Sequence, residues 1–401
     1  MYELIRYIKK ILLRCFLSPM RLCGIKQNRI FMHNDLAYNY SCSPRFLTEY
    51  LLEKYGDELD LVFSVKHPEK YQNLHNEVQF VRFNSIKYFF YAITAKIFIT
   101  NSGGFSYLPM SKKQVVINTN HGGGAYKKVG IDMFGDTFLF RKDLKLSADY
   151  TTVSLSTCVK YSDIASQVYL LPRKIFWEIG MPRNDMLIVG NNERRQRVRS
   201  ELQLGFDDKL VLYAPTYRKL DDNYFRDSIA VPYDIDSKAV CDALKKRFGG
   251  NWIFAVRFHP CVVNRDAFHD DSVLDLSDYE EMQDLLLAAD VMINDFSSSM
   301  WDFMLTGKPS FMYASDMEHY IKTTEVYTPV SEWPFPKAVT NDELVKNILT
   351  FDAEKYKLDC KRHYETLGGC ETGRATELVG EYIYQSTKSK KILSFNEVEH
   401  V

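Results

Sequence analysis

Three serines stand between two apolar runs in the stretch "INDFSSSMWDFMLTGKPSFMY", residues 293–313. The run VMIN predicts a buried strand, and residues 298–305 predict a helix. The serines would then lie at the start of this helix, where backbone N–H groups and the helix dipole favour an anion. Capping of the helix accounts for one serine but not readily for three. The stretch therefore predicts a phosphate-binding site at the serines, residues 297–299.

Two further polar clusters follow predicted strands in the same half of the chain. "APTYR" comes after "KLVLY" and contains Thr216 and Arg218, and "RFHP" comes after "WIFAV" and contains Arg257 and His259. A guanidinium suits a phosphate, and an imidazole can exchange a proton near neutral pH. Taken alone, a single histidine is more often a structural residue, so for the Arg257–His259 pair both interpretations stay open.

The first half of the chain contains the motif "HGGGAYKK", which begins at His121 and ends with Lys127 and Lys128. Its glycines would let the backbone approach a ligand closely, and its lysines could neutralise phosphate charge. It is not a Walker A loop, because the spacing and the terminal Ser or Thr are absent. A flexible turn followed by a solvated basic pair is the alternative. Arg183, in "GMPRND", could form a buried Arg–Asp contact or lie at the mouth of a cleft.

The elements that must position these clusters alternate between strands and helices. The runs LDLVFSV, KIFIT, QVVIN, KLVLYAP, WIFAVRF, VMIN and PSFMY predict buried strands, and DSKAVCDALKKRF and YEEMQDLLLAA predict helices. This alternation predicts parallel sheets flanked by helices, whose ligands bind beyond the carboxyl ends of the strands. We therefore expect an α/β protein with two doubly wound, Rossmann-like domains, residues 29–190 and 191–385, and a polar tail, residues 386–401.

Bulk properties narrow the function further. A chain of 401 residues suits two domains, and a net charge of −1 argues against a general nucleic-acid binder. The eight cysteines are scattered without CxxC spacing, which favours reduced cytosolic thiols over a zinc site or a disulfide framework. The sequence shows no acidic cluster with the spacing of a metal site.

Residues 1–28 are apolar but carry six basic side chains. The segment has no apolar run long enough to cross a bilayer and no cleavage site of a signal peptide. On a helical wheel five apolar residues fall roughly on one side: Ile5, Ile8, Leu12, Leu13 and Phe16. This pattern is typical of a helix in the interface of an anionic membrane. An ordinary basic helix packed on the domain is the alternative.

The order of the motifs "HGGGAYKKVG", "IGMPRNDML", "YAPTYR", "RFHP" and "NDFSSSMWDFMLTGKP" resembles the CDP-glycerol glycerophosphotransferase family. The resemblance covers about residues 90–380, and residues 295–309 are its most specific part. It implies a GT-B-like fold, in which two Rossmann-like domains face a central cleft. The N-terminal domain would present the acceptor, and the C-terminal domain would bind CDP.

The resemblance also assigns roles to residues. It implies that His121 and His259 are the essential catalytic residues, and that Ser297 and Ser298 contact the donor pyrophosphate. Further candidates for the CDP site are Thr216, Arg218, Arg257 and Asp295, and candidates for the acceptor site or the cleft are Lys127, Lys128 and Arg183.

Two positions depart from the family pattern. The family usually has Trp before its "HG" and Thr-Pro after it, whereas this chain has Asn120 and Gly123-Gly124. The walls around His121 are therefore expected to differ, and with them the acceptor or the transferred alditol.

The implied reaction moves an alditol phosphate, most simply glycerol phosphate, from a CDP-alditol to a hydroxyl of a lipid-linked glycan or a teichoic-acid-type polymer, and releases CMP. We expect His121 to be the base, while Arg218, Arg257, His259 and the serines stabilise the pyrophosphate. No tightly bound cofactor is expected, although Mg²⁺ could accompany the donor. The enzyme would serve cell-wall or capsule synthesis in the cytoplasm, at the inner face of the cell membrane, with residues 1–28 on the anionic surface.

Two other functions fit the same sequence. A GT-B glycosyltransferase would use a nucleotide sugar on the same fold. A membrane-associated protein that binds nucleotides or glycans without catalysis would keep the fold but not the reaction.

Overall fold

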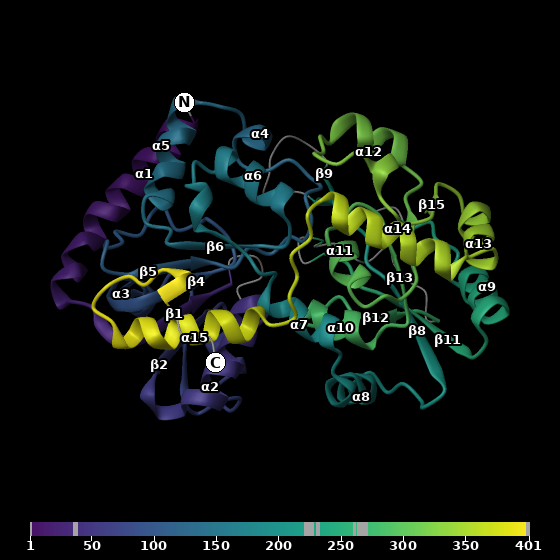
Figure 1. The fold of residues 1–401 in the computed structure, drawn as a ribbon, viewed down its shortest axis with the longest axis horizontal. Coiled ribbons are helices and arrows are strands. Elements are labelled where there is room, and N and C mark those ends of the chain that lie inside the picture. The colour runs from purple at the N-terminus through teal and green to yellow at the C-terminus, as the bar shows by residue number, and fades with distance from the viewer. Residues whose placement is uncertain are drawn as a thin grey trace. The chain divides into compact units, whose positions relative to one another are not determined.

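The computed structural model describes residues 2–34, 39–219, 228–229, 233–259, 262 and 272–397. The chain divides into two compact units. Unit 1 consists of Met1–His121, Lys128–Asp185 and Gly368–Val401, and unit 2 consists of Gly122–Lys127 and Met186–Leu367. Each unit contains a parallel sheet flanked by helices (Figure 1). The predicted α/β class with two doubly wound sheets is confirmed.

The sheet of unit 1 has seven parallel strands in the order β3-β2-β1-β4-β5-β6-β7. Their bounds are β1 Lys26–His33, β2 Asp60–Val65, β3 Val78–Arg82, β4 Ala95–Thr100, β5 Val115–Asn118, β6 Val153–Ser156 and β7 Phe176–Glu178. Ile30 of β1 pairs with Leu61 on one side and with Ile97 on the other. The buried runs of the central strands, such as IFM in β1 and IFI in β4, are apolar because helices cover both faces of the sheet.

Alternate residues of these strands enter two separate cores. Ile30 and Ile97 pack in one core with α2 (Cys42–Tyr55) and α15 (Ala375–Lys388). Phe31 and Phe98, one residue further along each strand, pack in the other core with α1 (Tyr2–Leu17) and α3 (Ile86–Thr94). The remaining helices of this unit are α4 Ile131–Phe134, α5 Phe138–Ala148 and α6 Val159–Val168, and α7 (Asp185–Val189) follows where the chain passes from unit 1 to unit 2.

The sheet of unit 2 has six parallel strands in the order β12-β11-β8-β13-β14-β15. Their bounds are β8 Asp208–Tyr213, β11 Asn251–Val256, β12 Leu274–Asp275, β13 Val291–Asn294, β14 Ser310–Tyr313 and β15 Lys337–Ala338. A separate antiparallel pair joins β9 (Arg218–Lys219) and β10 (Ser228–Ile229). The helices are α8 Asn192–Glu201, α9 Ser237–Phe248, α10 Met282–Ala288, α11 Ser299–Met304, α12 Met317–Thr323, α13 Asn341–Leu349 and α14 Ala353–Thr366.

The units divide the chain at other places than the expected domains. Gly122–Lys127 belongs to unit 2, and Gly368–Val401 belongs to unit 1. The physical reason for the second difference is α15, whose Val379 and Ile383 are fully buried in the core of unit 1. The expected tail likewise begins inside this helix, and its Phe395 packs on Trp177 with ring centroids 4.5 Å apart. Residues 398–401 of that tail lie outside the described residues.

The first helix packs on unit 1 by one of its sides. Leu17 is buried in the core, Leu13 packs against it, and Lys10 forms an ion pair with Asp143 of α5. Among the described residues, no helix is both long and apolar enough to span a bilayer. The cysteines are free thiols wherever the structure describes them; Cys261 falls outside that part of the chain.

Candidate functional site

The residues predicted for the donor site gather at one edge of the unit-2 sheet. Thr216 follows β8, His259 follows β11 and Asp295 follows β13, and these strands are neighbours in the sheet. Because all of them are parallel, the loops at their carboxyl ends lie along the same edge. This arrangement makes the edge the candidate donor-binding surface of unit 2. We call this edge, formed by the loops after β8, β11 and β13, the donor edge.

The carboxylate of Asp295 ties these loops together. It is 1% exposed, and its Oδ1 accepts hydrogen bonds from the backbone N–H groups of Thr216 (2.8 Å) and Phe296 (2.6 Å). Its Oδ2 accepts a bond of 2.8 Å from Nη1 of Arg218. A buried carboxylate is tolerated when it is paired and hydrogen-bonded in this way. Asp295 therefore fixes the loop after β8 to the loop after β13.

Arg218 is bound by two carboxylates. Besides Asp295, Asp316 accepts from its Nε (2.6 Å) and its Nη2 (2.8 Å), a bidentate pair. The guanidinium also lies over the rings of Tyr320 and Phe296, with centroid distances of 4.7 Å and 5.3 Å. Burial lowers the pKa of Arg218, but the two carboxylates outweigh it and raise this pKa above its ordinary value. The side chain predicted to hold a donor phosphate thus organises the surrounding loops.

The serines at the start of α11 have different surroundings. Oγ of Ser297 accepts from the backbone N–H of Ser299 (3.3 Å) and from its hydroxyl (3.0 Å). Asn294 donates to the same Ser299 hydroxyl at 2.5 Å. Ser298 begins the helix, and its side chain makes no capping hydrogen bond. The helix is shorter than the predicted span of residues 298–305.

Arg257 and His259 follow β11 in the same unit. Nε and Nη2 of Arg257 donate to the carbonyl of Tyr279 at 3.3 Å and 3.1 Å, and its Nη1 lies 3.2 Å from the sulfur of Met282. Burial lowers the pKa of Arg257, and Glu281 acts in the opposite direction. The imidazole of His259 packs against Tyr217 with ring centroids 4.7 Å apart. Pro260 of this motif lies outside the described residues.

His121 ends the first segment of unit 1 and is held by a backbone carbonyl. Its Nδ1 lies 2.7 Å from the carbonyl oxygen of Asn101, which follows β4. Because a carbonyl can only accept, Nδ1 must carry the proton. In the neutral imidazole, Nε2 is then the nitrogen that can take up a proton. His121 has the tautomer that a general base requires.

Buried amides support this imidazole. The side chain of Asn101 donates to Asn34 after β1 (2.8 Å), and Asn34 donates to the hydroxyl of Ser41 (2.7 Å). Asn120, whose φ of 54° is left-handed, donates to the carbonyl of Leu155 at 2.5 Å. Asn34 and Asn101 were not among the predicted residues, although both follow apolar runs as the predicted ones do.

The residues predicted for the acceptor site or the cleft are divided between the units. Lys128 and Arg183 belong to unit 1, and Lys127 belongs to unit 2. Arg183 is buried, and its Nη1 lies 3.8 Å from the sulfur of Cys42. Asp185 of the same motif accepts from the backbone N–H groups of residues 375 and 376 at the start of α15. The motif therefore anchors the returning helix.

The glycine run lies against α11. A Cβ added to Gly123 would stand 2.2 Å from Cδ1 of Trp301 and 2.8 Å from Oδ1 of Asp302. The carbonyl of the next residue but one, Ala125, accepts from Thr328 at 2.6 Å. Gly123 thus allows close packing of the backbone on an indole within unit 2. This contact gives a physical reason for the departure from Thr-Pro in this chain.

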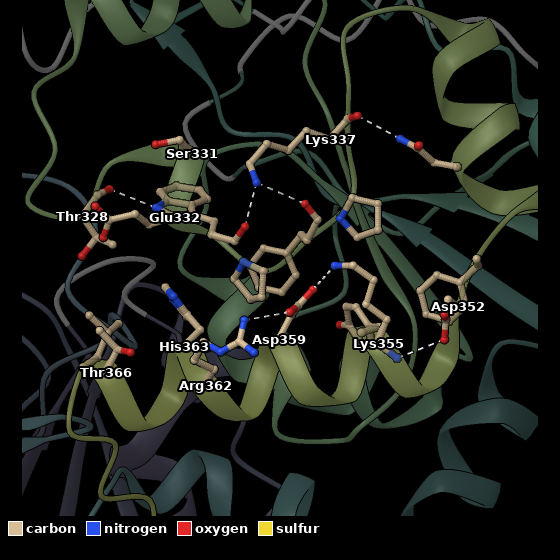
Figure 2. Close-up of a pocket in the computed structure, with 18 of the residues that line it drawn as sticks. Thr328, Ser331, Glu332, Lys337, Asp352, Lys355, Asp359, Arg362, His363 and Thr366 are labelled. Carbon is tan, nitrogen blue, oxygen red and sulfur yellow. Dashed lines mark hydrogen bonds and ion pairs between the residues drawn. The ribbon is translucent and has the colours of Figure 1, made fainter.

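Unit 2 also contains a pocket of about 710 Å³ along α14 (Figure 2). Its charges are largely matched internally, since Lys355 pairs with Asp359 and Lys337 donates to the carbonyl of Trp333 (2.7 Å). None of the predicted site residues lines it. Over the described part of the chain, no group of three or more His, Cys, Asp or Glu side chains could hold a metal ion.

Comparison with known proteins decides the family. A family model described as CDP-Glycerol:Poly(glycerophosphate) glycerophosphotransferase matches residues 16–385. The chain belongs to this family. It is accordingly a transferase of the CDP-glycerol glycerophosphotransferase type, as the motifs predicted.

Relatives in the glycerophosphotransferase family differ in length. The chain is 26% identical over 392 residues to a teichoic acid glycerol-phosphate transferase of Staphylococcus aureus (strain NCTC 8325 / PS 47), covering 94% of this chain and 99% of that one. It is 25% identical over 375 residues to a teichoic acid poly(glycerol phosphate) polymerase of Bacillus subtilis (strain 168), but spans only 49% of that polymerase.

Solved structures confirm the GT-B-like fold. A structure of the wall teichoic acid polymerase TagF, a variant soaked with CDPG, matches with a TM-score of 0.79 and 24% identity, over 96% of this chain and 97% of that chain. A UDP-GlcNAc 2-epimerase from Neisseria meningitidis matches with a TM-score of 0.51 and 10% identity, over 89% and 100%. At these identities the likeness concerns the fold.

The packing of Gly123 on Trp301 leads to a prediction about stability. Gly123→Ala should lower the free energy of unfolding by about 1–3 kcal/mol, because the added methyl group overpacks the indole. In a Trp301→Phe background the same change should cost less, since the smaller ring leaves room. Urea denaturation of the wild type, the two single variants and the double variant measures both costs.

Gly103→Ala is the matched control, because a Cβ at Gly103 meets no atom within 4 Å. If Gly123→Ala costs as much in the Trp301→Phe background as in the wild type, the indole is not what requires glycine.

Proposed function

We propose that this protein transfers glycerol phosphate from CDP-glycerol to a hydroxyl of a lipid-linked, teichoic-acid-type acceptor and releases CMP. Membership of the glycerophosphotransferase family supports the reaction class. The structural observation that carries the proposal is the imidazole of His121, whose Nδ1 donates to the Asn101 carbonyl. A base on the acceptor hydroxyl is what this displacement needs from the protein.

The reaction balances as one displacement. The acceptor hydroxyl gives its proton to Nε2 of His121, and its oxygen forms a bond to the phosphorus that bears the glycerol. The bond from this phosphorus to the bridging oxygen of the pyrophosphate breaks, and CMP leaves with the electron pair. The histidine becomes an imidazolium, and its Nδ1–H remains hydrogen-bonded to the carbonyl of Asn101.

The donor would be held by unit 2. The hydroxyl of Thr216 is buried and has no hydrogen-bond partner among the described residues. It can therefore donate a hydrogen bond to CDP-glycerol. The side chain of Ser298 makes no capping bond, and Arg257 and His259 follow the adjacent strand. Fixed donors and positive charge of this kind dominate catalysis of phosphoryl transfer. We propose that Mg²⁺, where the reaction uses it, arrives with the pyrophosphate rather than in a dedicated protein site.

Release of CMP from CDP-glycerol, with membrane lipids as the source of acceptor, tests this function. We expect His121→Gln to lower kcat by about 10²–10⁴-fold, because an amide cannot take up the proton. Binding of CDP should persist in this variant. His67→Gln, which changes an exposed histidine, is the matched control.

Near wild-type turnover in His121→Gln would exclude this residue as the base. CMP released from CDP-ribitol but not from CDP-glycerol would correct the alditol. A nucleotide sugar as the only productive donor would instead support a glycosyltransferase.

We also propose that the protein works in the cytoplasm, bound to the inner face of the cell membrane through α1. The side of this helix that faces away from the core exposes Leu12 (64%) and Phe16 (78%), together with Leu4, Ile5 and Ile8. The exposed basic residues Arg6 and Lys9 stand beside them. An apolar face with basic neighbours suits the interface of an anionic membrane. One side of the helix thus packs on unit 1, and the exposed apolar side supports the proposed membrane contact.

The double variant Leu12→Ser/Phe16→Ser should bind vesicles of phosphatidylglycerol and phosphatidylcholine at least about tenfold more weakly, because it removes two apolar side chains from the interface. Co-sedimentation with the vesicles measures the binding. Leu358→Ser, at an exposed position of unit 2, is the matched control. Unchanged sedimentation of the double variant would exclude α1 as the membrane contact.

A further inference from the structure

We propose that Lys127 supplies positive charge to the donor pyrophosphate, and so acts on the donor rather than on the acceptor. The inference rests on the proposed function, because it assumes that a cytidine diphosphate group binds at the carboxyl edge of the unit-2 sheet. It is an alternative to the expectation that Lys127 serves the acceptor site or the cleft.

The backbone of Lys127 is fixed to unit 2. Lys127 forms an antiparallel bridge with Val326, and the carbonyl of Tyr126 accepts from the N–H of Tyr327 at 2.6 Å. The hydroxyl of Tyr126 is hydrogen-bonded to Nε2 of His363 at 3.0 Å. These contacts fix the backbone at the lysine and at the residue before it, so its side chain starts from a defined place.

The side chain of Lys127 shares its surroundings with the Arg218 network. Its Nζ lies 5.6 Å from the ring centroid of Tyr320. Cζ of Arg218 lies over the same ring, 4.7 Å from its centroid. Tyr320 stacks on Phe296 with centroids 3.8 Å apart. Phe296 directly follows Asp295, the carboxylate at the centre of the donor edge. The amine is therefore directed towards the donor edge of unit 2.

The charged groups around this amine come from several elements. Asp295 after β13 and Arg218 of β9 act on it directly, and Asp316 before α12 is bound to Arg218. Glu325 is the sequence neighbour of the bridging residue Val326.

The charge balance explains why the amine matters. Asp295 and Asp316 carry two negative charges, and Arg218 matches only one of them. The group formed by these three side chains therefore has a net charge of −1, which a protonated Lys127 would neutralise. Both carboxylates are paired with Arg218, and Lys127 forms no ion pair with any residue that the structure describes. Its amine thus remains available for a phosphate oxygen.

Burial makes this charge dependent on pH. Desolvation lowers the pKa of Lys127 to about 8; Asp295 acts in the opposite direction, and Arg218 lowers it further. The amine is protonated below this pH and becomes neutral above it. A bound pyrophosphate favours the charged form, so donor binding above pH 8 should be accompanied by proton uptake.

The test is kcat/KM for CDP-glycerol measured at pH values on both sides of 8. The wild-type value should fall above this pH, and Lys127→Arg should remove the fall, because a guanidinium stays charged. Lys127→Gln should lower the value by about 10–100-fold below pH 8, the effect of losing one charged hydrogen bond. Lys322→Gln, an exposed lysine of α12, is the control for the loss of one positive charge.

Affinity for CDP, measured by calorimetry, gives a second readout that needs no acceptor. It should fall in Lys127→Gln by the same factor, and in the wild type as the pH rises. An unchanged CDP affinity in Lys127→Gln would overturn the proposal, as would a fall above pH 8 that persists in Lys127→Arg. Wild-type protein that binds CDP but releases no CMP would instead overturn the proposed function, while the CDP affinities of the variants would still decide the role of Lys127.

Discussion

The donor edge of unit 2 depends on one buried carboxylate. Asp295 accepts bonds from two backbone N–H groups and one guanidinium, and so joins the loops that follow β8 and β13. Arg218 extends this connection to Asp316 and therefore to the loop after β14. Removing one partner of such a buried pair typically costs about 3–5 kcal/mol, because the other charge is left uncompensated. The backbone position of Thr216 follows directly from this network.

His121, the proposed base, has a separate support. His121 is oriented by a backbone carbonyl at the end of β4, and the amides of Asn34 and Asn101 hold that carbonyl's loop in place. The amides that support His121 therefore belong to unit 1, and the charged side chains proposed to bind the donor belong to unit 2. Next in sequence to His121, Gly122–Lys127 packs within unit 2, so one short motif contributes to both.

Much of this arrangement could be predicted from the sequence because apolar runs end in polar residues. "KLVLY" before Thr216 and "VMIN" before Asp295 identify strands and the edge where ligands bind. The partners of the predicted residues could not be found in this way. Asp316 lies 98 residues from Arg218, and no local pattern joins them. The return of α15 to unit 1 was missed for the same reason, because the pattern of a helix shows an apolar face but not the sheet that it covers.

The measurement that tests this account most directly is the affinity of Asp295→Asn for CDP. The variant keeps the shape of the side chain and removes one negative charge next to the proposed donor site. If charge repulsion alone governed binding, affinity would rise. We predict instead a loss of about tenfold or more, because an amide offers a weaker partner to Arg218 and releases the loops that hold the donor. CDP affinity equal to or above that of the wild type would contradict the central role of this carboxylate.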